Sequence, residues 1–107
     1  MNPEQLRGNL DLILLTVLER EPLYGFAIIQ AARDRSGGYF DFREGSLYPA
    51  LHRLEAAGWL ATELREAGRN GQPRKYYAVT DAGRAELEVR RREFRAFTRA
   101  VADLHGA

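Results

Sequence analysis

Apolar residues recur every three or four positions between about Pro3 and Glu21, the spacing of one helix face; they are Leu6, Leu10, Ile13, Leu14 and Val17. Three more leucines, Leu12, Leu15 and Leu18, lie on a different side of the same helix. A helix that is apolar nearly all round needs cover on both sides. We therefore expect one face to pack on the domain core and the other to meet a second subunit, with Pro22 ending the helix.

Two shorter helices are expected next. The second begins at residues 23–25 and stops at the Ser36-Gly37-Gly38 sequence. The third opens with Gly45 and Ser46, and the Ser46 hydroxyl is predicted to cap it by accepting a hydrogen bond from a free backbone N–H. Pro49 then falls in the first turn, where its missing N–H costs nothing. Gly58 closes this helix.

The third helix has two unlike sides. Its inner side on a helical wheel holds Leu47, Ala50, Leu51, Leu54 and Ala57, and its outer side holds Tyr48, Pro49, His52, Arg53 and Ala56. The outer side is short and flat and carries hydrogen-bond donors. A helix that enters the major groove of DNA needs such a face, because small residues permit close approach and polar tips reach the base edges.

A β-hairpin is predicted after the third helix. Residues 59–65 alternate well enough for a strand, residues 66–73 contain the glycines, asparagine and proline of a turn, and residues 75–79 favour a returning strand. Arg69 lies at the tip and is flanked by Arg74 and Lys75, with no acidic residue between Arg69 and Lys75. A basic hairpin directly after a helix-turn-helix is a wing.

A long helix is predicted to complete the chain, capped by Thr80 and running from Asp81 to about Leu104. Leu87, Phe94, Phe97, Val101 and Leu104 follow one another at spacings of 7, 3, 4 and 3. This is a coiled-coil seam, too short to be stable alone. We therefore predict a dimerisation helix that packs with the first helix of the chain.

These elements predict an α+β fold that is mainly α. Residues 1–80 form a winged helix-turn-helix domain with an N-terminal helix, and residues 81–107 form a long C-terminal dimerisation helix. The length of 107 residues suits one domain. No apolar stretch approaches the length of a membrane span, since none is longer than the four residues of Leu12–Leu15. We expect a soluble, cytoplasmic protein with no membrane contact.

Composition excludes several kinds of chemistry. The chain has no cysteine, so it has neither disulfides nor a cysteine-based zinc site. Its two histidines, His52 and His105, lie 53 positions apart without ligand partners at metal-binding spacing. Ser46 and His52 fall on different sides of one helix, which argues against a nucleophile and its base. We predict no catalytic residue, no metal and no cofactor, and thus no enzyme.

Three separated motifs resemble those of PadR-like transcriptional regulators. Residues 45–59, GSLYPALHRLEAAGW, resemble the recognition-helix signature of that family. Leu23-Tyr24-Gly25 before it, and Arg74-Lys75-Tyr76-Tyr77 followed by Thr80 and Gly83 after it, are similar to the family in the same order. The resemblance covers about Leu6 to Gly83 and implies a dimeric repressor, similar to the short subgroup with a single C-terminal helix.

The resemblance and the helical wheel together nominate site residues. Those expected to face DNA are Tyr24, Ser46, Tyr48, Pro49, His52, Arg53, Arg69, Arg74, Lys75 and Tyr76. Those expected at the dimer interface are Leu6, Leu10, Leu14, Leu87, Phe94, Phe97, Val101 and Leu104. For Tyr24 and Tyr76, partial burial as packing residues is an equally good interpretation.

The favoured function is a repressor that binds double-stranded DNA at a near-palindromic operator as a homodimer. The alternative is a winged helix that binds protein without DNA, a use the fold also supports, although the acid-free wing argues against it. The resemblance also implies a small aromatic effector bound at the dimer interface, because some members of the family respond to aromatic compounds. The aromatic residues that could form its pocket are Phe26, Tyr39, Phe40, Phe42, Phe94 and Phe97. Simple packing of an aromatic core and seam is the favoured interpretation of the same residues.

Overall fold

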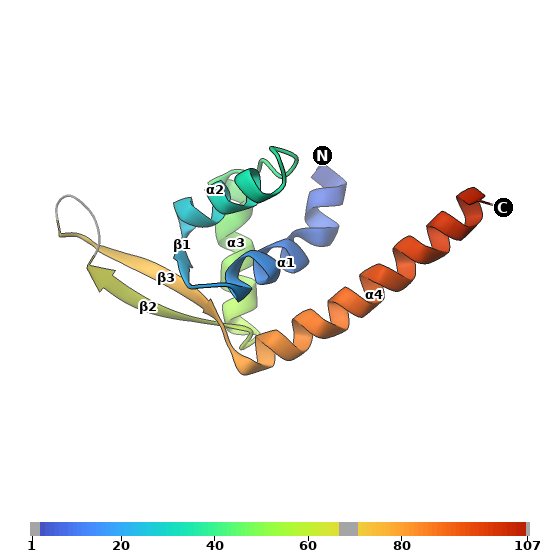
Figure 1. Ribbon diagram of the computed structural model, residues 1–107. Coiled ribbons are helices and arrows are strands. Elements are labelled where there is room, and N and C mark those ends of the chain that lie inside the picture. The colour runs from blue at the N-terminus through green and yellow to red at the C-terminus, as the bar shows by residue number, and fades with distance from the viewer. Residues whose placement is uncertain (1–2, 67–70, 107) are drawn as a thin grey trace.

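The computed structural model describes residues 3–66 and 71–106 of the chain, without the side chains of residues 3–8. Its elements follow in the order α1 (Pro3–Glu19), β1 (Leu23–Tyr24), α2 (Gly25–Arg35), α3 (Glu44–Ala56), β2 (Leu60–Glu66), β3 (Pro73–Val79) and α4 (Asp81–Gly106). Figure 1 shows three helices gathered beside a β-hairpin, from which α4 extends. The predicted α+β, mainly helical winged-helix fold is confirmed.

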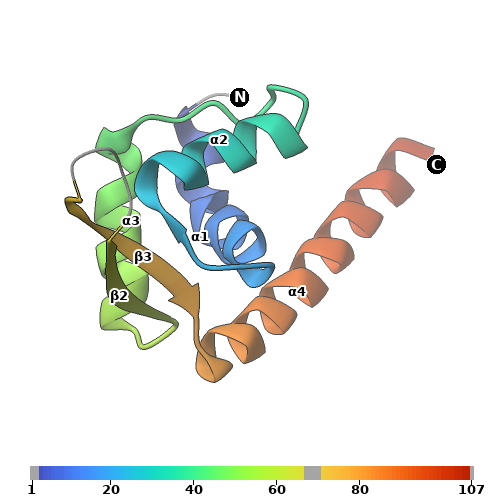
Figure 2. The same cartoon turned by 60° about the vertical axis from the view of Figure 1, so that its left-hand side comes forward.

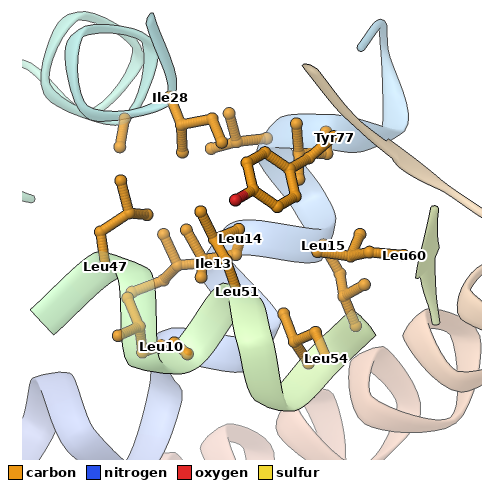
Figure 3. Close-up of a cluster of buried hydrophobic side chains, with 14 of the residues drawn as sticks. Leu10, Ile13, Leu14, Leu15, Ile28, Leu47, Leu51, Leu54, Leu60 and Tyr77 are labelled. Carbon is orange, nitrogen blue, oxygen red and sulfur yellow. The ribbon is translucent and has the colours of Figure 1, made fainter. Parts of the chain in front are cut away.

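The core surrounds α1, which contacts α2, α3, α4 and β3. Side chains from both of its apolar sides are buried, and the cluster also takes Ile28 from α2, Leu47, Leu51 and Leu54 from α3, and Tyr77 from β3 (Figure 3). The sequence predicts that one side of α1 meets a second subunit. For Leu10 and Leu14 this prediction is wrong: both are buried in the chain's own core, because α2, α3 and β3 all pack on α1 (Figure 3).

Helix α3 begins at Glu44, two residues before the predicted cap. The N–H groups of Ser46 and Leu47 both donate to the Arg43 carbonyl at 3.0 Å, so Arg43 is the N-cap residue and Ser46 lies within the helix. No side chain caps this end. Pro49 consequently lies in the interior of the helix, beyond its first turn. The predicted Ser46 cap was wrong because these backbone hydrogen bonds start the helix earlier.

The sheet has three antiparallel strands in the order β1-β3-β2. Strand β1 is only two residues long and was not predicted; it pairs Leu23 with Tyr77 and Tyr24 with Tyr76. Strands β2 and β3 pair from Leu60 with Val79 out to Glu66 with Pro73. Successive side chains along a strand point to opposite faces. Because Tyr77 is buried, its face is the inner one, and Tyr76 lies on the outer face.

Thr80 caps α4 as predicted. Its Oγ1 accepts a hydrogen bond from the Gly83 N–H at 3.0 Å and donates one to the Gly58 carbonyl at 2.6 Å. Gly83 lies so close to the end of α3 that a Cβ there would collide with the Trp59 carbonyl oxygen. Leu87, one turn further, is fully buried in the core. These contacts fix the start of α4 on the winged-helix domain.

The remainder of α4 leaves the domain, and the molecule is 58 Å long as a result (Figure 2). Most of the residues from 92 to 106 are exposed. None of the helices that the structure describes combines the length and the apolar character needed to cross a membrane.

Candidate nucleic-acid interface

The exposed face of α3 is centred on Pro49, His52 and Ala56. All three are exposed, while Leu47, Leu51 and Leu54 on the opposite side are completely buried. The core thus fixes the rotation of the helix about its axis. Ser46, also exposed, lies on one edge of this face. Small side chains at the centre let a flat surface approach the helix closely.

Tyr48 forms the edge of this face nearest α2. Its hydroxyl oxygen would collide with a Cβ added at Gly25, the first residue of α2, so only glycine leaves room for the tyrosine ring. The Tyr48 side chain is nevertheless partly open to solvent. It therefore packs between the two helices of the helix-turn-helix while its outer edge stays available for a hydrogen bond.

Arg53 forms the opposite edge, and its charge is paired. Its Nη2 donates to Oδ1 of Asp11 on α1 at 2.5 Å. The Arg53 side chain is still 58% exposed, whereas that of Asp11 is 17% exposed. The sequence predicted that Arg53 lies on the exposed face of its helix without a partner. In the structure it pairs with the carboxylate of Asp11, which is 42 residues away in the sequence, so no local pattern could show the pair.

The inner face of the wing carries Lys75, whose charge is also near an acid. Its Nζ lies 3.7 Å from Glu55 Oε1 on α3, and Thr62 of β2 donates to the other Glu55 oxygen at 3.3 Å. The sequence has no acidic residue between Arg69 and Lys75, but the fold brings the Glu55 carboxylate of α3 close to Lys75. Burial raises the pKa of the neighbouring Tyr77, and the charge of Glu55 raises it further, so this phenol stays protonated.

The outer face of the sheet carries an Arg–Tyr ladder, defined as Arg65, Tyr76, Tyr24 and Arg74. The two tyrosine rings meet edge to face, with centroids 5.5 Å apart. Arg65 lies 4.6 Å from the centre of the Tyr76 ring, and Arg74 lies 4.4 Å from that of Tyr24. Cation–π contacts of this kind restrain a guanidinium group without neutralising its charge.

This ladder shows the packing that the sequence allowed for Tyr24 and Tyr76. Both are half-buried, their rings contact each other, and each ring also contacts an arginine. Arg65 was not among the predicted site residues, although the hairpin register places it directly opposite Arg74. Its guanidinium group also pairs with Glu63 at 2.5 Å. Arg69 lies outside the described residues.

The predicted dimerisation residues fall into two groups. Leu10, Leu14 and Leu87 have their side chains in the core of the chain itself, which removes them from any interface with a partner. Phe94, Phe97 and Leu104 are exposed, Phe97 by 66% and Leu104 by 79%, and Val101 is half-buried. The Leu6 side chain lies outside the described part of the structure.

An open cavity of about 470 Å³ lies between α1, the end of α2 and α4. Its lining is mostly apolar and includes Leu12 and Ile13 from α1, Phe40 after α2, and Phe94 from α4. Thr16, Arg35 and Ser36 add polar atoms. The Ser36 hydroxyl is already used, since it donates to the Ala32 carbonyl at 2.7 Å and accepts from the Phe40 N–H at 2.9 Å.

Comparison with known proteins gives consistent matches. Residues 14–89 match the model of the transcriptional regulator PadR-like family. A 57-residue segment, 53% of this chain and 51% of the relative, is 47% identical to the transcriptional regulator Rv3488 of Mycobacterium tuberculosis. The fold is similar to that of a transcriptional regulator from Clostridium thermocellum, with a TM-score of 0.84, 25% identity, and coverage of 94% of this chain and 96% of the other.

A PadR family transcriptional regulator from Eggerthella lenta is also similar, with a TM-score of 0.80 and 34% identity over 94% of this chain and 85% of the other. The family match spans the helix-turn-helix, the wing and the docked start of α4, the parts that the geometry singles out. The chain therefore belongs to the PadR-like family of transcriptional regulators, whose members are not enzymes.

Proposed function

We propose that this regulator binds double-stranded DNA as a homodimer and represses transcription from a near-palindromic operator in the cytoplasm. The observation that carries the proposal is the joint placement of the flat outer face of α3 and the restrained cations of the wing on one small domain. In this proposal α3 enters the major groove, His52 and Tyr48 donate hydrogen bonds, and wing cations contact phosphates. Two recognition helices on successive grooves would block polymerase.

The homodimer part of the proposal is supported by the outer half of α4. Phe94, Phe97 and Leu104 lie at the spacing of a helix–helix seam and are exposed in the single chain. A second copy provides an identical seam, and a symmetric interface buries both. The seam then fixes the distance between the two recognition helices, and with it the spacing of the half-sites.

The effector part of the proposal is supported by the cavity between α1, α2 and α4. Its apolar, aromatic lining suits a small aromatic compound, and Phe94 belongs both to the cavity and to the seam. A compound bound there would push on α4 and change the half-site spacing. Thermal shifts with neutral, anionic and cationic substituted benzenes test this. Thr16→Phe, which fills the cavity, should abolish the shift, whereas the control Thr98→Phe on α4 should retain it.

The main experiment selects bound fragments from genomic DNA with the purified protein and measures the affinity of the selected fragment at several salt concentrations. The proposal predicts a fragment with two related half-sites that binds about a thousandfold or more tightly than unrelated DNA. Equal binding to all sequences would leave a non-specific DNA-binding protein. No DNA binding at all would favour the alternative, a winged helix that binds another protein.

A further inference from the structure

Asp11 on α1 lies between the recognition helix and α4 and contacts an arginine on each. Its Oδ1 accepts a hydrogen bond from Arg53 of α3 at 2.5 Å, and its Oδ2 lies 3.6 Å from Nη1 of Arg90 on α4. Asp11 is the least exposed of the three side chains, at 17%. One carboxylate therefore serves as counter-ion for two guanidinium groups that belong to different functional elements.

The two arginines are not held equally. Arg90 also donates from Nε to Glu86 at 2.8 Å, and its guanidinium carbon lies 5.1 Å from the centre of the Trp59 ring. Arg53 has Asp11 as its one ion-pair partner within the part of the chain that the structure describes. Arg53 is thus the less firmly anchored of the two arginines, and it stands at the edge of the α3 face.

The charge of Arg90 affects how firmly Asp11 holds Arg53. Two like charges that share one counter-ion repel each other, and the repulsion grows as they approach. When Arg90 lies close to Asp11, Arg53 is released more easily; when α4 carries Arg90 away, Asp11 is left to hold Arg53 alone. The position of α4 is in this way connected to a cation on the recognition helix.

We propose that Asp11 is a positioning residue, a shared counter-ion through which α4 controls whether Arg53 is available to the DNA backbone. The inference rests on the proposed DNA-binding function. In this proposal α4 affects DNA binding in two ways, through the spacing of the half-sites and through the charge on α3. Any event that displaces α4 changes whether Arg53 is free to contact DNA.

The test uses Asp11→Asn and a 30-bp duplex of mixed sequence. Releasing Arg53 adds about one phosphate contact per protomer, so the slope of log affinity against log salt becomes steeper by about 0.9 per protomer. The matched control is Glu19→Gln, which removes one negative charge from the same helix, where Glu19 pairs with Arg91 of α4 at 2.8 Å. We expect the slope of this control to equal that of the wild type.

Two further variants make the test specific. In an Arg53→Gln background, Asp11→Asn should leave the slope unchanged, because the cation that it releases is gone. Arg90→Gln should weaken DNA binding more than its control Arg91→Gln, because Asp11 then holds Arg53 alone. If circular dichroism shows that Asp11→Asn does not fold, the comparison of Arg90→Gln with Arg91→Gln still tests the shared counter-ion.

The outcomes separate the inference from the function on which it rests. Equal slopes for Asp11→Asn and Glu19→Gln, or a steeper slope that persists without Arg53, would overturn the shared counter-ion and leave only the effect of net charge. Failure of the wild-type protein to bind any duplex would instead overturn the proposed function.

Discussion

The two halves of α4 form one continuous helix, but their surroundings differ. In the first half Gly83 lies against Trp59, Leu87 is buried, and Arg90 and Arg91 pair with acids of α1. In the second half, from residue 92 to 106, most side chains face solvent, Phe97 and Leu104 among them. The apolar positions of both halves nevertheless follow a single heptad-like spacing.

The difference teaches that spacing identifies a helix face without identifying what covers it. Leu87 and Phe94, seven residues apart, occupy equivalent positions of one seam, yet Leu87 is buried in its own chain and Phe94 is exposed. The winged-helix domain fully buries Leu87 near the start of α4, whereas the following turns lie beside α1 only through the ion pairs of Arg90 and Arg91 and the open cavity at Phe94. The outer turns extend beyond the domain, so Phe97 and Leu104 are exposed in the single chain, as the proposed dimer requires.

The largest expected effect comes from a charge in the outer half. Phe97→Glu places a carboxylate in the proposed seam, where an unpaired charge is costly to bury. We expect monomers by light scattering and loss of operator binding. Ala102→Glu adds the same charge about 140° away around the helix and should remain dimeric. A dimeric Phe97→Glu protein would show that the seam is assigned to the wrong residues.

Truncating one leucine in each half sharpens the comparison. Leu87→Ala should lower the free energy of unfolding by about 2–5 kcal/mol, because it removes buried methyl groups and leaves a cavity. In the monomeric Phe97→Glu background, where no partner covers the seam, Leu104→Ala should lower it by less than about 1 kcal/mol, since the side chain is 79% exposed in the single chain. Urea unfolding at matched protomer concentration measures both. Equal losses would mean that the outer half is as firmly packed as the first.

Cations of the wing and of the outer helix should differ in their effect on DNA binding. Changing Arg74 and Lys75 together to glutamine should flatten the dependence of log affinity on log salt by about 2 units per protomer, because each side chain contributes about one phosphate contact. The matched control changes Arg95 and Arg99 on α4 and should leave the slope as it was. If the control flattens the slope equally, the outer half of α4 also lies along the DNA.

The smallest effect concerns the ion pair between Glu19 and Arg91. The hydrogen bond from Arg91 lowers the pKa of Glu19 below its ordinary value of 4.5. The pair therefore stabilises the fold above pH 4.5, and this contribution disappears as the pH falls through the lower pKa of the folded state. Both side chains are partly exposed, so the contribution is about 0.2–1 kcal/mol.

Comparing Glu19→Gln with Glu93→Gln in urea unfolding at pH 7 and pH 3 measures that contribution. At pH 7 the first variant should be the less stable of the two, and at pH 3 the gap should be smaller. A gap as large at pH 3 as at pH 7 would show that the Glu19 side chain stabilises the fold by packing and not by its charge.

The sequence was sufficient to predict the four helices, the hairpin and the Thr80 cap, because each depends on local periodicity or on hydrogen bonds between near neighbours. Strand β1 was not predicted, because two residues are too few to show an alternating pattern and they pair with β3, which is distant in the sequence. The start of α3 was predicted about one turn too late. The helix starts with backbone hydrogen bonds to the Arg43 carbonyl, and a backbone carbonyl cannot be recognised from the residue types.

The sequence predicted most of the residues that form the candidate site, but it did not predict the acidic residues that pair with them. The outer face of α3 and the wing cations followed from the helical wheel and the turn. The acids that meet Arg53 and Lys75 come from other elements, Asp11 on α1 and Glu55 on α3, and only the tertiary fold brings them together. The Arg–Tyr ladder likewise required the strand register.

Hydroxyl-radical footprinting of a fragment selected from genomic DNA, at low salt and with well-folded protein, shows whether α3 and the wing bind DNA. We expect two protected segments related by two-fold symmetry, with their centres about 34–36 Å apart or a multiple of that distance. We also expect that Phe97→Glu abolishes both segments together. A fragment without any protected segment would contradict the claim that α3 and the wing bind DNA.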